Sequence, residues 1–153
     1  MTTFGISIGA TTGATVDETG EIHRNELGGH TTASLVAFTG EGRQLGEAAV
    51  SGLSANAKST AMQVGRLALL PYDAHTTGDG ERTSRHWQFG HAAGDDGKMA
   101  MVDVAVAGKS EPQTIGGVAL LGALLGKMRQ TSNAPEGAPV SIALPPAVDE
   151  SAR

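Results

Sequence analysis

The chain opens with short runs of alternating apolar and polar side chains, separated by glycine-containing turns. This pattern predicts strands over residues 4–9, 13–17 and 21–25, joined by turns at residues 9–12 and 18–20. Residues 35–38 are apolar and β-favouring, and they indicate a fourth strand. Because the first three strands follow one another so closely, we expect them to form a meander.

The middle and the end of the chain mix helical and strand patterns. We expect helices at residues 45–50 and within 59–69, and strands at 87–89 and 99–107. Apolar side chains at helical spacing predict the longest helix over residues 113–130. A polar loop over 133–139 then leads to a strand at 140–144. The pattern as a whole predicts a mixed α/β lobe with an inserted segment.

Length and composition exclude several classes of protein. The chain has 153 residues, which suits one domain, and no cysteine, so disulfides and cysteine-based metal sites are excluded. Its formal net charge of −5 argues against non-specific nucleic-acid binding. The most apolar stretch, residues 115–125, is too short to span a bilayer. We therefore expect a cytoplasmic protein with neither a nucleic-acid nor a membrane partner.

The first turn is the strongest candidate for a binding site. Gly9, Ala10, Thr11 and Thr12 are expected to present backbone N–H groups and hydroxyls in one concavity, which suits phosphate oxygens. The turn contains no basic residue, so an anion would be held mainly by dipoles. An ordinary hairpin turn accounts for the same residues, and both interpretations stay open on this segment alone.

Other candidate sites are weaker. His86, His91, Asp95 and Asp96 are of metal-ligating types, but their spacing matches no standard metal site, so a solvated loop is the preferred interpretation. Neither Ser34 nor Ser141 lies in a Gly-x-Ser-x-Gly elbow, and nucleophilic catalysis by these serines is therefore unsupported. We assign no catalytic residue and no metal ligand.

Several motifs in a fixed order carry a family resemblance. After the first turn come, in order, Glu21–Asn25, Gly28–Thr39, Leu45–Ala49, Arg66-Leu67 and Val140–Pro146. In this order and at these spacings the chain resembles the N-terminal part of the 70-kDa heat-shock chaperones, the DnaK-like family of ATPases. The resemblance runs from residue 4 to residue 153; it is strong over 5–67 and weak over 71–113.

The resemblance implies an α/β fold, an actin-like ATPase (ribonuclease H-like) lobe whose mixed sheet carries an inserted, smaller α+β subdomain. Residues 1–153 would be lobe I of a partial nucleotide-binding domain, with a core subdomain of 1–33 and 112–153 and an inserted subdomain of 34–111. The family's second lobe and substrate-binding domain would lie beyond residue 153. We therefore expect a fragment, whose exposed apolar face would allow a homodimer.

In the family, the first turn and a residue near position 65 hold ATP or ADP with Mg²⁺. The resemblance carries this role to Gly9, Ala10, Thr11, Thr12 and Gly65 in the full-length parent, with weak or absent binding in this chain. Ser7 stands where the family has an aspartate that organises the Mg²⁺ shell, and Gly65 stands where it has the catalytic lysine. Loss of both groups favours nucleotide binding with impaired hydrolysis.

These departures resemble atypical relatives of the family, namely a ribosome-associated subunit and the 110-kDa exchange factors, the latter through Pro145-Pro146. Pro145 and Arg153 also match residues that relay nucleotide state between domains in the family, but without the partner domain we expect Pro145 simply to end a strand and Arg153 to be a chain end. Three hypotheses follow: a chaperone lobe with impaired hydrolysis, a competent ATPase whose other catalytic residues lie beyond this chain, or a nucleotide-free module that docks a co-chaperone or exchange factor. By resemblance, the partners are unfolded polypeptide and co-chaperones.

Overall fold

The computed structural model describes residues 3–145, which form three β-sheets and five α-helices. The strands are β1 (Phe4–Ile8), β2 (Thr12–Val16), β3 (Thr32–Ala33), β4 (Leu35–Thr39), β5 (Gly42–Leu45), β6 (Thr60–Met62), β7 (Gly90–Ala93), β8 (Ala100–Val104), β9 (Gln113–Gly116) and β10 (Val140–Ala143). The helices are α1 (Glu47–Val50), α2 (Val64–Leu69), α3 (Asp73–Thr76), α4 (Gly78–Ser84) and α5 (Gly117–Thr131), with a 3₁₀ turn at Ala57–Ser59. The predicted mixed α/β fold is confirmed.

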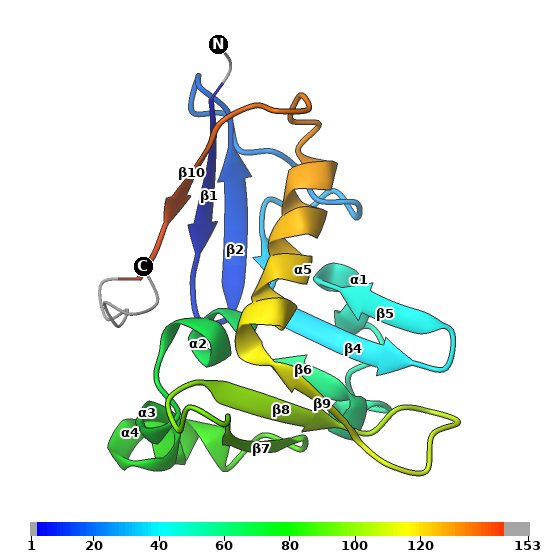
Figure 1. Ribbon diagram of the computed structural model, residues 1–153. Helices are drawn as coiled ribbons and strands as arrows, with labels where there is room; N and C mark the ends of the chain where they lie inside the picture. The colour runs from blue at the N-terminus through cyan, green and yellow to red at the C-terminus, as the bar shows by residue number, and fades with distance from the viewer. Residues whose placement is uncertain (1–2, 146–153) are drawn as a thin grey trace.

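The largest sheet joins the two ends of the described chain. Its strand order is β10-β1-β2-β3, and β10 runs parallel to β1, so that Ser7 lies opposite Ala143. The other pairs in this sheet are antiparallel. Figure 1 shows β10 along the left side of β1, with both strands ending just above α2. Parallel strands end at the same edge, so the first turn and the segment after β10 meet there.

The two smaller sheets come from the stretch between β3 and α5. Their strand orders are β5-β4-β6 and β7-β8-β9. Helix α5 begins near both of them and rises beside β2, contacting α2 and strands of all three sheets (Figure 1). A single hydrophobic cluster continues through the three sheets, α2 and α5. The helix therefore joins the layers through one core.

Helix α5 confirms the helical spacing seen in the sequence, but it begins later than predicted. Its buried residues are Gly117, Leu120, Leu121, Leu124 and Met128, which recur at intervals of three and four. Residues 113–116, predicted as the first helical turn, form β9 instead because they pair with β8. Backbone pairing within a sheet has overridden the helical pattern there.

The outer face of α5 gives a stability test. A Cβ added at Gly126 would meet no atom within 4 Å, and the residue is exposed. Gly126→Ala is therefore expected to stabilise the protein by about 1 kcal/mol, since alanine loses less backbone entropy in a helix. Urea denaturation of both proteins measures this change. An unchanged or lower urea midpoint for Gly126→Ala would show that this face of the helix contacts other atoms.

Two predicted strands are wrong, for different reasons. Residues 21–25 form only an isolated bridge between Ile22 and Val16. The chain turns there around Asn25, whose side-chain oxygen accepts hydrogen bonds from the amides of Leu27 and Gly29. Residues 87–89 form a loop rather than a strand, in which Trp87 and Phe89 are buried and Gln88 is exposed.

Two predicted helices are confirmed only in part. The first is shorter than predicted: it begins at Glu47, because residues 42–45 pair with β4 as β5. The second is divided: residues 60–62 form β6 and α2 follows from Val64. Gln63 separates them in a left-handed conformation, with φ of 55°. Strand and helix therefore occupy a stretch that reads as one helix in the sequence.

Candidate functional site

The first turn closes as a tight hairpin at the end of β1. The Gly9 amide donates a hydrogen bond to the Thr12 carbonyl oxygen at 2.8 Å. A Cβ at Gly9 would lie 2.9 Å from that oxygen, closer than real Cβ contacts allow, so the turn requires glycine. Ala10, Thr11 and Thr12 are exposed at its tip.

A cavity of about 360 Å³ lies where this turn meets the ends of β10 and α2. Its lining residues are Ser7, Ile8, Gly9, Ala10, Gly65, Arg66, Leu69, Leu70, Ala143, Leu144 and Pro145. We call it the turn cavity. Three of the predicted nucleotide-binding residues, Gly9, Ala10 and Gly65, line it together with the segment that leads to Pro145. Residues far apart in the sequence thus form one hollow.

Gly65 forms the contact between α2 and the first turn. A Cβ at this position would lie 2.6 Å from the Gly9 carbonyl oxygen and 2.9 Å from Cγ2 of Ile8. The Gly65 amide is already used, since it donates to the hydroxyl oxygen of buried Ser34 at 3.0 Å. Gly65 therefore forms a closely packed wall of the turn cavity. Its N–H group is hydrogen-bonded to Ser34 and does not face a ligand in the cavity unpaired.

Arg66 is the charged residue of the turn cavity. Among the described lining residues it alone carries a charged side chain. Its Nη2 donates to the Ala74 carbonyl oxygen at 3.3 Å, whereas its Nε is buried and has no hydrogen-bond partner within residues 3–145. Arg66 was not predicted as a site residue, because its place in the cavity depends on the packing of α2 against β1 and β10.

Behind Arg66 lies a fully buried histidine. His75 packs against Trp87 with ring centroids 5.7 Å apart, and neither of its ring nitrogens has a partner in the described part of the chain. Burial, followed by the positive charge of Arg66 and by His91, lowers the pKa of His75 from 6.5 to about 4. The ring is therefore neutral at pH 7, and Arg66 carries the positive charge here.

The expectation of a single concavity at the first turn is wrong. A second cavity, of about 650 Å³, lies on the other side of the turn, and Thr11, Ser34, Gln63 and Trp87 are among its lining residues. Thr12 lines neither cavity as the described residues define them. The turn is thus a ridge with Gly9 and Ala10 facing the turn cavity and Thr11 facing the second one.

The weaker metal candidates are spread over one strand, one loop and one turn. His91 lies on β7 and packs edge-on against Trp87, with ring centroids 5.2 Å apart. Asp96 lies in the turn between β7 and β8, where its carboxylate accepts hydrogen bonds from two backbone amides. Within residues 3–145, no three histidine or acidic side chains are grouped so as to hold a metal ion.

The structure also bears on membrane crossing and on the expectations for the last residues of the chain. Over the same residues, none of the helices combines the length and the apolar character that a membrane crossing needs. The expectations for Pro146 and Arg153 fall outside the described residues, whereas Pro145 lies within them at the rim of the turn cavity.

The comparison with protein families agrees with the order of motifs in the sequence. A family model described as Hsp70 protein matches residues 3–152. This match covers nearly all of the 153 residues, including β1, the first turn, Gly65 and β10. The chain therefore belongs to the Hsp70 family.

Proposed function

We propose that this chain is part of the nucleotide-binding domain of an Hsp70-type chaperone and binds the phosphates of ATP or ADP at the first turn. One observation carries the proposal: the parallel pairing of β1 with β10 brings the Gly9 turn, Gly65 and Pro145 around one cavity. Membership of the Hsp70 family supports a nucleotide as the ligand. Unfolded polypeptide and co-chaperones are the partners proposed on the same ground.

The proposed fold is an actin-like, ribonuclease H-like lobe. We assign residues 1–33 and 112–153 to its core subdomain and residues 34–111 to the inserted one. The strand order supports most of this division, because β1, β2, β3 and β10 share one sheet while β4 to β8 lie in the two smaller sheets. It departs from the division at β9, which falls within residues 112–153 but pairs with β8 in a smaller sheet. The turn cavity would then lie in the core subdomain, with α2 of the inserted subdomain as its floor.

Hydrolysis is proposed to be impaired in this chain. Ser7 is exposed at the end of β1 and offers a hydroxyl where the family has a carboxylate. Position 65 has no ammonium group, and its Cβ position is filled by the Gly9 carbonyl oxygen. Mg²⁺ prefers carboxylate and phosphate oxygens, and no carboxylate lines the described cavity, so the lining does not fit a protein-bound Mg²⁺.

An alternative function is a nucleotide-free module that docks a co-chaperone or exchange factor. The observation that favours it is the open edge of β10, which has one strand neighbour among the described strands and exposes 47% of Ile142. Edge strands with apolar side chains are common sites of strand addition. This alternative predicts that the protein does not bind nucleotide.

Calorimetric titration of ATP into the 153-residue chain tests the proposal. We expect weak but saturable binding by the unmodified protein, and at least a tenfold (about 1.4 kcal/mol) weaker binding by Gly9→Ala, which distorts the turn. Gly126→Ala, on the far helix α5, is the matched control and should bind as the unmodified protein does. In a single-turnover assay the bound ATP should remain unhydrolysed.

Three outcomes would contradict this proposal. Absence of ATP binding by the unmodified protein would favour the docking module. Equal binding by Gly9→Ala, with circular dichroism showing a folded protein, would place the nucleotide elsewhere. Release of ADP in the single-turnover assay would show that hydrolysis survives without the family's aspartate and lysine.

A further inference from the structure

We propose that Arg66 is the anion-binding residue of the turn cavity and that it binds a phosphate group there without Mg²⁺. The inference deepens the proposed nucleotide site and rests on it for the class of ligand. It concerns how this chain compensates for a site that lacks both a carboxylate at position 7 and an ammonium at position 65. The charge of the cavity lining, the hydrogen bonds of Arg66 and the residues around it support this inference.

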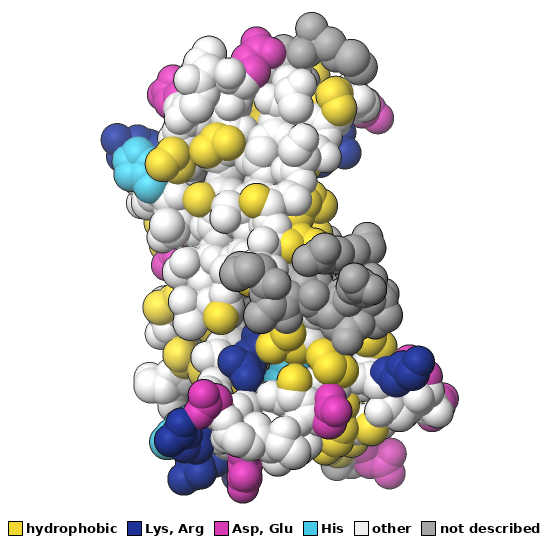
Figure 2. Space-filling view, turned by 90° about the vertical axis from the view of Figure 1, so that its left-hand side faces the viewer, with side chains coloured by type: hydrophobic (Ala, Val, Ile, Leu, Met, Phe, Trp, Pro, Cys, Tyr) yellow, Lys and Arg dark blue, Asp and Glu magenta, His cyan; other side chains and the backbone are white. Residues whose placement is uncertain are grey.

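The described lining of the turn cavity carries a net positive charge. Arg66 contributes a positive charge, and no acidic side chain is among the described lining residues. Most of the lining is apolar, including Ile8, Leu69 and Leu144. Figure 2 shows this side of the molecule, where a basic group lies among hydrophobic side chains below the grey atoms. An unbalanced positive charge in an apolar hollow attracts an anion strongly, because water screens it poorly there.

Arg66 has hydrogen-bonding capacity that the described residues do not use. A guanidinium has five N–H donors, and one of them reaches the Ala74 carbonyl oxygen at 3.3 Å, which is long for such a bond. The buried Nε makes no hydrogen bond within residues 3–145. Buried donors without a partner are costly, so an arginine in this state favours a ligand with acceptor oxygens.

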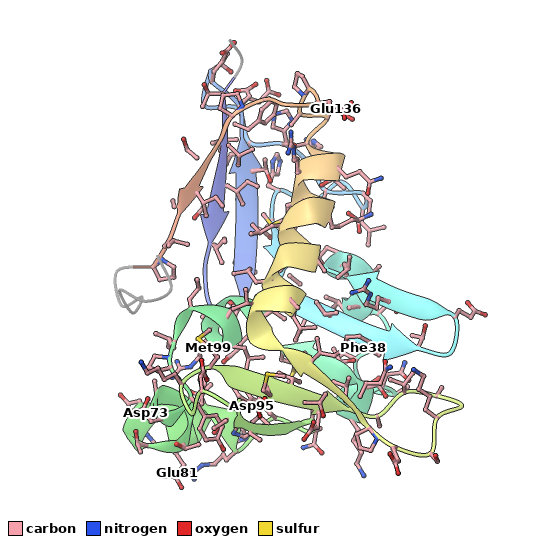
Figure 3. The ribbon with its side chains drawn as sticks, in the orientation of Figure 1. Phe38, Asp73, Glu81, Asp95, Met99 and Glu136 are labelled. Atoms are coloured by element: carbon pink, nitrogen blue, oxygen red, sulfur yellow. The ribbon has the colours of Figure 1, made fainter. Side chains whose placement is uncertain are left out.

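Neighbouring carboxylates do not neutralise Arg66 within the described part of the chain. Among the described residues, no carboxylate forms an ion pair with it. The acidic residues of α3 and α4 are exposed, and Figure 3 shows Asp73 and Glu81 at the outer corner of these two helices. Within residues 3–145, the charge of Arg66 is therefore not paired on the cavity side.

Further hydrogen-bond donors line the turn cavity beside Arg66. The Ala10 amide donates to no backbone or side-chain acceptor of the described chain, and Ser7 adds an exposed hydroxyl. Both residues line the cavity with Arg66. A guanidinium, a backbone N–H and a hydroxyl together match the oxygens of a phosphate group, whose charge they balance in place of a metal ion.

A competing explanation is purely structural, since the bond from Arg66 to Ala74 also ties α2 to α3. The two roles can be separated by charge and by stability. Arg66→Lys keeps the positive charge, whereas Arg66→Gln removes it and keeps some hydrogen-bonding capacity. Arg85→Gln, at the exposed end of α4, changes the net charge equally and serves as the control.

Titration of inorganic pyrophosphate in EDTA into the full 153-residue chain tests the inference. We expect the unmodified protein to bind pyrophosphate. MgCl₂ in excess over EDTA and pyrophosphate should not strengthen this binding. Arg66→Gln should weaken binding at least about tenfold, Arg66→Lys by a smaller factor, and Arg85→Gln not at all. Higher salt should weaken binding by the unmodified protein more than by Arg66→Gln.

The outcomes separate this inference from the proposed function. If ATP binds but Arg66→Gln binds pyrophosphate and ATP as tightly as the unmodified protein, Arg66 is not the anion-binding residue and the nucleotide site stands. If pyrophosphate binding depends on Arg66 but ATP does not bind, the inference stands and the nucleotide function fails. A requirement for Mg²⁺, or equal weakening by Arg85→Gln, overturns the inference. Thermal unfolding of each variant shows whether it is folded.

Discussion

Gly65→Ala is expected to destabilise the protein by about 2–3 kcal/mol, because the new methyl group has no room between α2 and the first turn. Its Cβ would lie 2.6 Å from the Gly9 carbonyl oxygen. That oxygen belongs to the backbone of a tight hairpin, so it cannot move aside as a flexible side chain can. Either α2 must withdraw or the end of β1 must bend, and both changes expose part of the core.

Urea denaturation compares Gly65→Ala with Gly126→Ala, which adds the same methyl group where no atom lies within 4 Å. The first variant should lose stability and the second should gain it. A Gly65→Ala protein as stable as the unmodified one would show that α2 does not pack against the turn. The same contact means that Gly65→Lys would distort the turn cavity, so the substitution would not restore the family's lysine in its place.

Acidification is expected to remove at most about 3 kcal/mol of stability through His75 alone. The folded protein holds this ring neutral, with a pKa of about 4 against 6.5 for a solvated histidine. Because the folded pKa is the lower one, the unfolded chain binds the extra proton between these values. The contribution is complete above pH 6.5 and is lost progressively as the pH falls towards 4.

The groups that face His75 act mostly in the same direction. Burial is the largest cause of the lowered pKa, followed by the positive charge of Arg66 on α2 and by His91 on β7. The backbone of Leu70 and the charge of Asp73 on α3 oppose them. Burial also lowers the pKa of His91, so this second histidine adds to the loss of stability in acid.

Urea midpoints measured from pH 7.5 to pH 4 test this prediction, with His75→Phe as the informative variant. Phenylalanine keeps an aromatic ring beside Trp87 and removes the titrating group, so the stability should fall less steeply with acid. His30→Gln, which replaces an exposed histidine, is the matched control. An equally steep fall in His75→Phe would assign the acid sensitivity to other groups.

Local patterns in the sequence predicted the elements that depend on local signals. The alternation in β1 and β2, the turn at Gly9 and the helical spacing of α5 are all visible in the sequence itself. Residues 21–25 were predicted wrongly because the side chain of Asn25 organises a turn that strand propensity does not reveal. β5 and β9 were missed because each forms by pairing with a neighbouring strand, β4 and β8 respectively.

The candidate site was predictable only as a set of positions. The sequence indicated Gly9 and Gly65, and the structure places them in van der Waals contact at the turn cavity. The sequence did not reveal that Thr11 faces a second cavity or that Arg66 carries the charge of the first one. Both facts depend on how α2 packs against β1 and β10, which is a contact between segments distant in the chain.

The parallel pairing of β1 with β10 also sets the order in which this protein is able to fold. The β1–β2 hairpin is local and forms early, but one side of β1 stays without a partner until residues 140–143 have been synthesised. Until then the nascent chain carries an open sheet edge, which is prone to join other chains. This member of the Hsp70 family thus has a late-closing sheet of its own.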